Sequence, residues 1–304
     1  MQTATEAADR IRIGMPNDAG QFTLPLAHKR GYLRDEGFDA ELITITGPVA
    51  NVALANGDID YFTGFGSAIR AMIQGQLPTR IVACYRPVAH FVLVTRPEIK
   101  TIKELKGKTI GASPGTAPDL VARLMMKHFG FEPDKDIKFI GSPGGETALH
   151  RMSQKQIDGQ VMPVPWDYQS RKLGLNILAR AEDLFTYPIS GLITQTRKIK
   201  ERPDEIRRVI KATIRANRFI RDNRDEAVRI LIGWGKVERE FAYASYDALR
   251  NLFNADGAVP EDGLKLVIEQ TRRGNKVARE VAPGEVVDLS FLREAQAELG
   301  IKAR

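Results

Sequence analysis

The sequence contains a single cysteine, Cys84, so no disulfide can form within the chain. This residue ends the apolar run Ile81–Cys84, and a free cysteine in such a run usually packs as a small core side chain. The chain also lacks any apolar run of the roughly 20 residues that a transmembrane helix needs. Residues 1–10 have no hydrophobic signal-peptide centre. We therefore expect either a cytosolic protein or a sequence that begins at the mature end of an exported precursor.

Several motifs for metal and nucleotide chemistry are missing as well. The four histidines do not have the spacing of metal ligands: His28, His90, His128 and His150. The stretch Gly111–Thr116 lacks the lysine of a P-loop, which argues against nucleotide hydrolysis. Gly64-Phe65-Gly66 begins like a dinucleotide fingerprint, but Ile69 occupies the place of its third glycine. We expect no metal and no cofactor.

One stretch does match a catalytic motif. Gly111-Ala112-Ser113-Pro114-Gly115 has the Gly-x-Ser-x-Gly spacing of an acyl-transfer nucleophile. That motif needs a backbone N–H on the residue after the serine, and Pro114 has none. We interpret the match as accidental, and because no other catalytic set is evident the sequence favours a binding protein over an enzyme.

The composition is that of a globular protein with a sizeable core. The 304 residues are 43% hydrophobic and 27% charged, which is long enough for two ordinary domains. The net charge is +7 and the pI about 9.4. Such a basic balance permits an anionic ligand, a membrane surface or nucleic acid as a partner, without selecting among them.

Strand patterns and helix patterns alternate along the first two thirds of the chain. Strands are expected at 10–15, 40–46, 61–65, 80–85, 90–95, 109–110, 136–140, 159–162, 176–179 and 191–196. Helices are expected between them at 24–30, 49–56, 69–74, 119–129, 145–154 and 166–173. Beyond Pro203 the chain reads as nearly all helical, including 238–251, 264–277 and 289–299. This order predicts mostly parallel sheets with helices on both faces.

A row of basic residues marks the first helix of the C-terminal part. The spacings of four, four and three place them on one helix face: Arg207, Lys211, Arg215 and Arg218. Such a row could contact a membrane surface or nucleic acid. We expect it to be an ordinary solvated face.

The chain contains a weak internal repeat. Asn56-Gly57-Asp58-Ile59-Asp60 ends one predicted helix and enters a strand, and Gln154-Lys155-Gln156-Ile157-Asp158 does the same later. The two Ile-Asp pairs occupy the same place in each unit. The repeat predicts two lobes of similar construction.

The stretch Gly107–Leu120 combines features that suit an anion. A short strand leads into the small residues Gly111–Thr116, and a helix then begins with Pro118 and Asp119 in its first turn. The unpaired N–H groups and partial positive charge of a helix start favour an anion, and the serine and threonine add hydroxyls. We expect this turn to hold the acidic head of a small ligand; an ordinary strand-to-helix turn is the alternative.

Aromatic and polar residues gather where other strands are predicted to end. The groups are Asn17, Asp18, Gln21 and Phe22; Phe65 and Ser67; Tyr85 and Arg86; and Trp166 and Asp167. Ligands of open α/β sheets bind outside the carboxyl ends of the strands, so these loops are candidate pocket walls. Arg86 could pair with the ligand's head through two N–H groups, or could be an exposed arginine.

Taken together, several segments resemble the periplasmic substrate-binding proteins of ABC importers. The resemblance is to the branch that includes sulfonate, taurine, nitrate and thiamine-precursor binders. It covers 11–196 well and the helical remainder loosely. The segments that carry it are 27–38 (AHKRGYLRDEGF), 53–60 (ALANGDID), 102–111 (IKELKGKTIG), 156–159 (QIDG) and 165–166 (PW).

The resemblance implies an α/β fold of the two-lobed, type II periplasmic-binding-protein class. Each lobe would be a mostly parallel sheet flanked by helices, closing on the ligand by hinge motion. Lobe 1 would comprise 10–95 and 189–304, with the C-terminal helices, and lobe 2 would comprise 96–188. The crossovers would fall near 95–97 and 187–189. The family places the mature protein in the periplasm, as a monomer that delivers its solute to an inner-membrane permease.

The strand-end groups and the resemblance together predict which residues contact the ligand. These are Asn17, Gln21, Phe22, Gly64, Phe65, Ser67, Tyr85, Arg86, Ser113, Gly115, Thr116, Ala117, Met162, Pro165, Trp166 and Tyr187. Family members often carry an acidic residue in the loop that here reads Val164-Pro165-Trp166-Asp167, where the only acid comes last. The expected ligand is a small organic anion, a sulfonate or carboxylate, with an aromatic or partly apolar body.

Two other functions remain open. The first is binding of a thiamine-pyrimidine precursor, or an enzyme on the same scaffold; the yeast-type thiamine-pyrimidine enzymes carry a cysteine-rich motif that one cysteine cannot supply. The second is the effector domain of a transcription regulator. No helix-turn-helix pattern precedes Ile11, so we expect no nucleic-acid partner.

Overall fold

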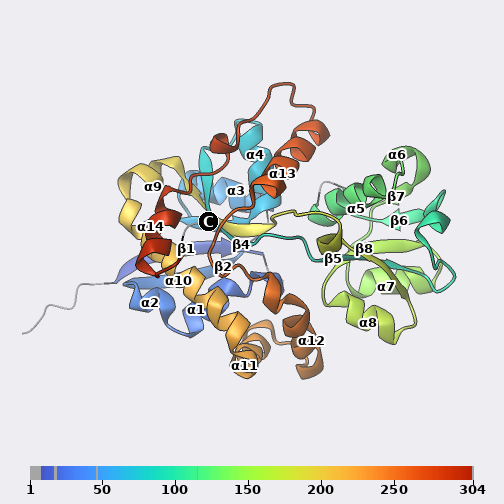
Figure 1. Cartoon of the computed structure of the whole chain (residues 1–304), viewed down its shortest axis with the longest axis horizontal. Helices are drawn as coiled ribbons and strands as arrows, with labels where there is room; N and C mark the ends of the chain where they lie inside the picture. The colour runs from blue at the N-terminus through green and yellow to red at the C-terminus, as the bar shows by residue number, and fades with distance from the viewer. Residues whose placement is uncertain (1–7, 17–18, 46, 115, 303–304) are drawn as a thin grey trace, which may run out of the picture. The chain divides into compact units, whose positions relative to one another are not determined.

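The computed structural model describes residues 8–302 apart from 17–18, 46 and 115. The chain forms two compact units (Figure 1). Unit 1 comprises residues 1–87, 188–242 and 250–304, and unit 2 comprises residues 88–187 and 243–249. Each unit contains a five-stranded sheet of its own.

The sheet of unit 1 has the strand order β2-β1-β3-β10-β4. Its strands are β1 (Asp9–Met15), β2 (Phe38–Thr44), β3 (Tyr61–Gly64), β4 (Thr79–Arg86) and β10 (Ser190–Gln195). β1 pairs in parallel with β2 and β3, whereas β10 is antiparallel to both of its neighbours. Four of the five strands therefore run in one direction, and β1–β3 end at the same edge of the sheet.

Helices cover both faces of this sheet. In Figure 1, α3, α4 and α13 lie on one face and α1 and α10 on the other. The helices that begin in residues 1–87 are α1 (Thr23–Lys29), α2 (Tyr32–Asp35), α3 (Gly47–Asn56) and α4 (Phe65–Ile73), with the 3-10 turn η1 (Ala19–Gln21). Those of the C-terminal part are α9 (Thr196–Glu201), α10 (Pro203–Asp222), α11 (Arg224–Gly235), α12 (Arg239–Leu249), α13 (Glu261–Gly274) and α14 (Ser290–Glu298), with η4 (Arg250–Leu252) and η5 (Pro283–Glu285).

The sheet of unit 2 has the order β7-β6-β8-β5-β9. Its strands are β5 (Phe91–Thr95), β6 (Thr109–Gly111), β7 (Lys138–Ile140), β8 (Gly159–Pro163) and β9 (Asn176–Arg180). Its helices are α5 (Ala117–His128), α6 (Pro133–Asp136), α7 (Glu146–Ser153) and α8 (Trp166–Lys172), with η2 (Ile102–Leu105) and η3 (Ala181–Asp183). In Figure 1, α5 and α6 lie on one face of this sheet and α7 and α8 on the other.

The two sheets have the same topology, which confirms the internal repeat. β2, β1, β3, β10 and β4 correspond in order to β7, β6, β8, β5 and β9, with an antiparallel strand in the fourth place of each. Asp60 Oδ2 accepts a hydrogen bond from Arg12 N (2.7 Å), and Asp158 Oδ2 accepts one from Thr109 N (2.8 Å). The repeated aspartates therefore fasten equivalent strands at equivalent places.

The structure corrects the first predicted lobe boundary. The strand expected at 90–95 had been assigned to lobe 1, but β5 pairs with β8 and β9 and belongs to unit 2. The first boundary accordingly lies between Pro87 and Val88, and residues 243–249 also belong to unit 2. Burial explains the error, because β5 is buried along its whole length and its apolar pattern does not reveal its neighbours.

Several further elements differ from the prediction: α4 begins at Phe65 rather than at residue 69, and α2 was not predicted. Asp136 ends the short helix α6, so the strand expected from this residue begins at Lys138. The helix α9 directly follows β10 and has no counterpart among the predicted elements. Short helices of one or two turns have too few residues to show a clear apolar period.

The basic row of α10 is not a simple solvated face. Its members form ion pairs with α2, α14 and their own helix: Arg207 with Asp204 and Glu298, Lys211 with Glu36 and Glu298, and Arg215 with Asp35 and Glu36. Arg218 Nε donates to Ala255 O (3.0 Å). These side chains are therefore engaged in ion pairs and hydrogen bonds within unit 1. No helix in the described part of the chain, α10 included, is long and apolar enough to cross a membrane.

Candidate functional site

In unit 2, the loops after β6 and β7 are tied to each other and to the first residues of β8 at one edge of the sheet. Ser113 Oγ, after β6, donates to Ser142 O in the loop after β7 (3.1 Å). Gln160 Nε2, on β8, donates to Ser142 O (3.2 Å) and to Pro143 O (3.0 Å). β6 is parallel to both of its neighbours, β7 and β8, so the carboxyl ends of the three strands point toward the same edge. The turn that the sequence identified therefore belongs to a defined edge of unit 2.

The helix α5 begins at this edge without a side-chain cap. Thr116 is its N-cap residue, with φ −88° and ψ 166°, but its side chain makes no capping hydrogen bond. Thr116 Oγ1 donates instead to Ser113 O (2.7 Å). The first-turn N–H groups of α5 are consequently left without the partner that a threonine N-cap normally supplies. An anion at this helix start would meet N–H donors and a favourable dipole.

A second helix, α7, begins at the same edge beside an aromatic ring. Its N-cap residue, Gly145, has φ +67° and ψ −144° and provides no side-chain cap. A Cβ at this position would lie 3.0 Å from Cζ2 of Trp166, so the indole ring lies against the glycine backbone. Trp166 begins α8 and is partly exposed. Unit 2 therefore presents two uncapped helix starts and an indole ring along one edge.

Gln160 is a site residue that the sequence did not reveal. Its side chain is only 2% exposed, and its Oε1 has no hydrogen-bond partner in the described part of the chain. Oε1 lies against Gly111, where a Cβ would overlap it and would also lie 2.8 Å from Ser142 Cβ. Its only sequence signal is a polar residue within the buried strand β8. Gln160 fixes the Ser142–Pro143 loop and thereby the edge itself.

Asp167, in the first turn of α8, forms ion pairs with two arginines. Asp167 Oδ2 accepts hydrogen bonds from Arg171 Nη2 (2.5 Å) and Arg180 Nη2 (2.7 Å), and the residue is 4% exposed. These contacts anchor α8 to β9. Asp167 therefore does not supply a free carboxylate at this edge.

In unit 1, Arg86 ends β4 and is 3% exposed. Its Nε donates to Ser190 Oγ (3.3 Å), and its guanidinium occupies the space that a side chain on Gly20 would fill. Gly64 pairs with Ser190 across β3 and β10, so it lies beside the same serine. The structure thus brings the predicted Gly64 and Arg86 together, and Arg86 is not the exposed arginine that was the alternative.

Gln21 and Phe22 lie near the carboxyl end of β3, which is also part of unit 1. Thr63 Oγ1 donates to Gln21 Oε1 (2.8 Å), which joins η1 to β3. The ring of Phe22 is 6.1 Å from that of Trp234 on α11, at an interplanar angle of 32°. Trp234 was not among the predicted residues, since only folding brings α11 to the start of α1.

Most of the predicted contact residues with aromatic or long apolar side chains are buried inside their own unit: Phe22, Phe65, Tyr85, Met162 and Tyr187. Burial raises the pKa of the Tyr85 and Tyr187 hydroxyls, so both stay protonated near neutral pH. The ring of Phe65 lies against Gly191 of β10. Contact of these side chains with a ligand stays a prediction.

The remaining predicted residues fall into two groups. Asn17 and Gly115 lie outside the described residues. Ser67 on α4 is partly buried, and its carbonyl accepts a hydrogen bond from Asn51 Nδ2 (3.1 Å). Ala117 begins α5, and Pro165 precedes α8. Their role in binding stays a prediction too.

Comparison with protein families gives a match over most of the chain. The family model described as "NMT1/THI5 like" matches residues 21–227. A curated relative from Brucella abortus (strain 2308), named as a candidate binding protein, is 27% identical over 236 residues. The alignment covers 75% of this chain and 72% of the relative. This family match confirms the resemblance inferred from the sequence.

Solved structures share the fold at low sequence identity. The periplasmic aliphatic sulphonate binding protein SsuA from Escherichia coli has a TM-score of 0.75 at 18% identity, covering 92% of each chain. The alkanesulfonate-binding protein SsuA from Xanthomonas axonopodis pv. citri, bound to MOPS, has a TM-score of 0.71 at 17% identity, covering 96% of this chain and 99% of that one. The desulfurization enzyme DSZB has a TM-score of 0.70 at 14% identity, covering 95% and 100%. The predicted two-lobed periplasmic-binding-protein fold is confirmed, and binding proteins and an enzyme both use it.

Proposed function

Because the chain belongs to the NMT1/THI5-like family, we propose that it is the solute receptor of an ABC importer and binds a small organic anion. In this proposal the protein acts as a monomer in the periplasm and delivers its ligand to an inner-membrane permease. Closure of the two units on the ligand, which the family resemblance implies, is part of the proposal.

The observation that carries the proposal is the start of α5. Its first turn has no side-chain cap, and Thr116 Oγ1 is turned away to Ser113 O. The start of α7 lies along the same edge, and Gln160 holds the connecting loop in place. This edge therefore offers N–H donors of fixed position to a sulfonate or carboxylate.

The body of the ligand is proposed to be aromatic or partly apolar. The indole of Trp166 lies next to the start of α7 and offers a flat apolar surface. Two proteins with this fold, the SsuA proteins named above, are sulfonate-binding proteins, and one of them was solved with MOPS bound. Arg86 of unit 1 is a second candidate contact for the head, since guanidinium groups bind such oxygens through paired N–H groups.

A thermal-shift screen tests the ligand class. Alkanesulfonates, arenesulfonates and carboxylates are compared with sugars, cationic amines and an aminopyrimidine at equal concentration. A ligand at about 100 times its Kd should raise the free energy of unfolding by roughly 2.7 kcal/mol. Stabilisation by sulfonates or carboxylates is expected, and small-angle scattering should then show a smaller radius of gyration. Stabilisation only by sugars or amines would contradict the proposal, and stabilisation only by the pyrimidine would favour precursor binding.

A matched pair of variants tests the start of α5. Aspartate and asparagine are both good N-caps, so Thr116→Asp and Thr116→Asn should each fold normally. The carboxylate of T116D would occupy the helix start and repel an anion, lowering affinity by roughly tenfold or more. T116N would cap the same N–H groups without adding a charge, so it should lose clearly less affinity than T116D. Isothermal titration calorimetry with the best ligand from the screen measures both.

The comparison of the two variants isolates charge from shape. Unchanged affinity in both T116D and T116N would place the anion elsewhere. Equal loss in both would show that capping of the N–H groups, rather than the added charge, displaces the anion.

Catalysis by cysteine is disfavoured by the structure of unit 1. Cys84 is fully buried, its Sγ lies 3.5 Å from Ser190 O, and burial raises its pKa far above the neutral range. A thiolate nucleophile is therefore not available at neutral pH. Turnover of a stabilising ligand during prolonged incubation would revive the enzyme alternative.

A further inference from the structure

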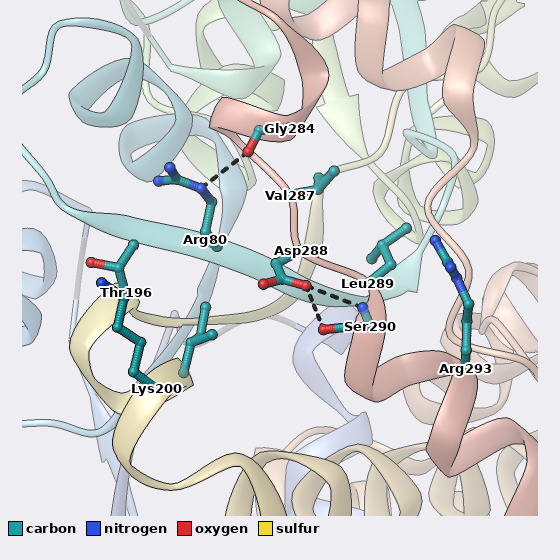
Figure 2. Close-up of a pocket in the computed structure, with 10 residues that line it drawn as sticks. Arg80, Thr196, Lys200, Gly284, Val287, Asp288, Leu289, Ser290 and Arg293 are labelled. Carbon is teal, nitrogen blue, oxygen red and sulfur yellow. Dashed lines mark hydrogen bonds between the residues drawn. The ribbon is translucent and has the colours of Figure 1, made fainter.

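A second pocket lies in unit 1, away from the edge that contains Arg86. Its volume is about 550 Å³. Figure 2 shows its lining residues, which come from the start of β4, from α9 and from residues 284–293. β4 runs from Thr79 to Arg86, so Arg80 and Arg86 mark opposite ends of one strand. This pocket is therefore separate from the ligand contacts proposed above.

The wall of the pocket is fixed by backbone pairing. Ile81 N donates to Val286 O (2.8 Å), and Asp288 N donates to Ile81 O (2.9 Å). The segment 286–288 thus continues the sheet beyond β4. Val287 and Leu289 line the pocket from this segment, and Ile199 lines it from α9. The apolar part of the lining consequently rests on a rigid element.

Some charged side chains that line the pocket already have hydrogen-bond partners, and others do not. Arg80 donates from Nε to Gly284 O (3.2 Å) and from Nη1 to Thr79 O (2.8 Å). The side chains of Lys200 and Arg293 are exposed and have no ion-pair or hydrogen-bond partner among the residues that the structure describes. Asp288 Oδ1 accepts from Ser290 N (3.1 Å) and Ser290 Oγ (2.6 Å). Two cations therefore face the pocket unneutralised.

The positions of these groups suggest the shape of an occupant. In Figure 2, Arg80 and Lys200 lie on one side of the pocket, Arg293 lies on the other, and Val287 and Leu289 lie between them. Asp288 also lies in this middle region and disfavours an anionic group there. We propose that the pocket binds an α,ω-dianion: a ligand with an anionic group at each end and an aliphatic chain between them.

The volume and lining agree with such a ligand. Small-molecule sites typically enclose about 300–1,000 Å³, with mainly apolar walls and a few polar groups that fix the orientation. One end of the ligand would bind Lys200, on the side of the pocket that Arg80 also lines, and the other end would bind Arg293 at the first turn of α14. The chain between the two ends would cover Val287, Leu289 and Ile199. A linear dicarboxylate is the simplest compound of this class.

Calorimetry with a chain-length series tests the proposal. Succinate, adipate, suberate and sebacate are titrated into the full chain, with octanoate as the one-ended comparison. An intermediate or long diacid is expected to bind at least roughly tenfold more tightly than octanoate. Lys200→Gln and Arg293→Gln should each weaken the diacid by roughly tenfold. Lys103→Gln removes the same charge from η2 of unit 2 and should leave the affinity for the diacid unchanged.

Three outcomes of this titration series would overturn the proposal, and a fourth comes from the T116D variant. They are no binding of any diacid at millimolar concentration, equal affinity for octanoate and suberate, and unchanged binding in both K200Q and R293Q. The T116D variant separates this site from the one proposed above. If T116D abolishes diacid binding, the diacid occupies the unit 2 edge and the second pocket is empty. If T116D weakens a sulfonate but not the diacid, two independent sites exist.

Discussion

Replacing Glu205 by alanine is expected to lower the free energy of unfolding by about 3–5 kcal/mol, because it removes the acceptor of a buried network. Glu205 is 3% exposed. It accepts hydrogen bonds from Tyr61 Oη (2.8 Å), Lys198 Nζ (2.7 Å) and Arg202 Nε (3.2 Å). Without the carboxylate, the buried Tyr61 hydroxyl loses its acceptor, and Lys198 keeps its ion pair with Asp60, at 2.9 Å.

Urea denaturation can follow this change within unit 1 alone. The chain has two tryptophans, Trp166 in unit 2 and Trp234 in unit 1, so a Trp166→Phe background leaves Trp234 as the reporter. Glu261→Ala is the matched control, since Glu261 forms an exposed ion pair with Lys265 four residues along α13. Such a pair contributes little to stability, so the urea midpoint of E261A should equal that of the background protein. If E205A unfolds at the same urea concentration as E261A, the network does not stabilise unit 1.

Gly191→Ala is expected to destabilise unit 1 by at least about 3 kcal/mol, since one added methyl group would overlap fixed backbone. A Cβ at this position of β10 would collide with the carbonyl oxygen of Ala83. It would also lie 2.8 Å from Cys84 Cα and 2.6 Å from Phe65 Cζ. The neighbouring strand β4 cannot move away without losing its pairing with β10.

Gly66→Ala provides the control for this substitution. Gly66 is an exposed residue of α4, and a Cβ there would meet nothing within 4 Å. Because alanine favours the helix, G66A should stabilise the protein slightly, by about 0.5–1 kcal/mol. The same urea measurement in the Trp166→Phe background reports both variants. A similar midpoint for G191A and G66A would show that β10 can shift to accommodate the methyl group.

The sequence by itself determined the elements and their repetition. Apolar periodicity and glycine stop signals are local properties, so they located β1, α1, β3, α5 and α8 to within two residues. The repeated Ile-Asp pairs correctly indicated two units of one topology. The α5 turn could be identified because a helix start makes its N–H groups available whatever surrounds it.

Tertiary structure alone decided which groups meet. Gln160 contacts Ser142 and Arg86 contacts Gly20 across distances in the sequence that no local pattern encodes. The same holds for the row of α10, because the carboxylates of α2 and α14 that neutralise it become neighbours only on folding. β5 shows the limit most clearly: a strand buried on both faces has the same apolar sequence in either sheet, and only its hydrogen-bond partners assign it to unit 2.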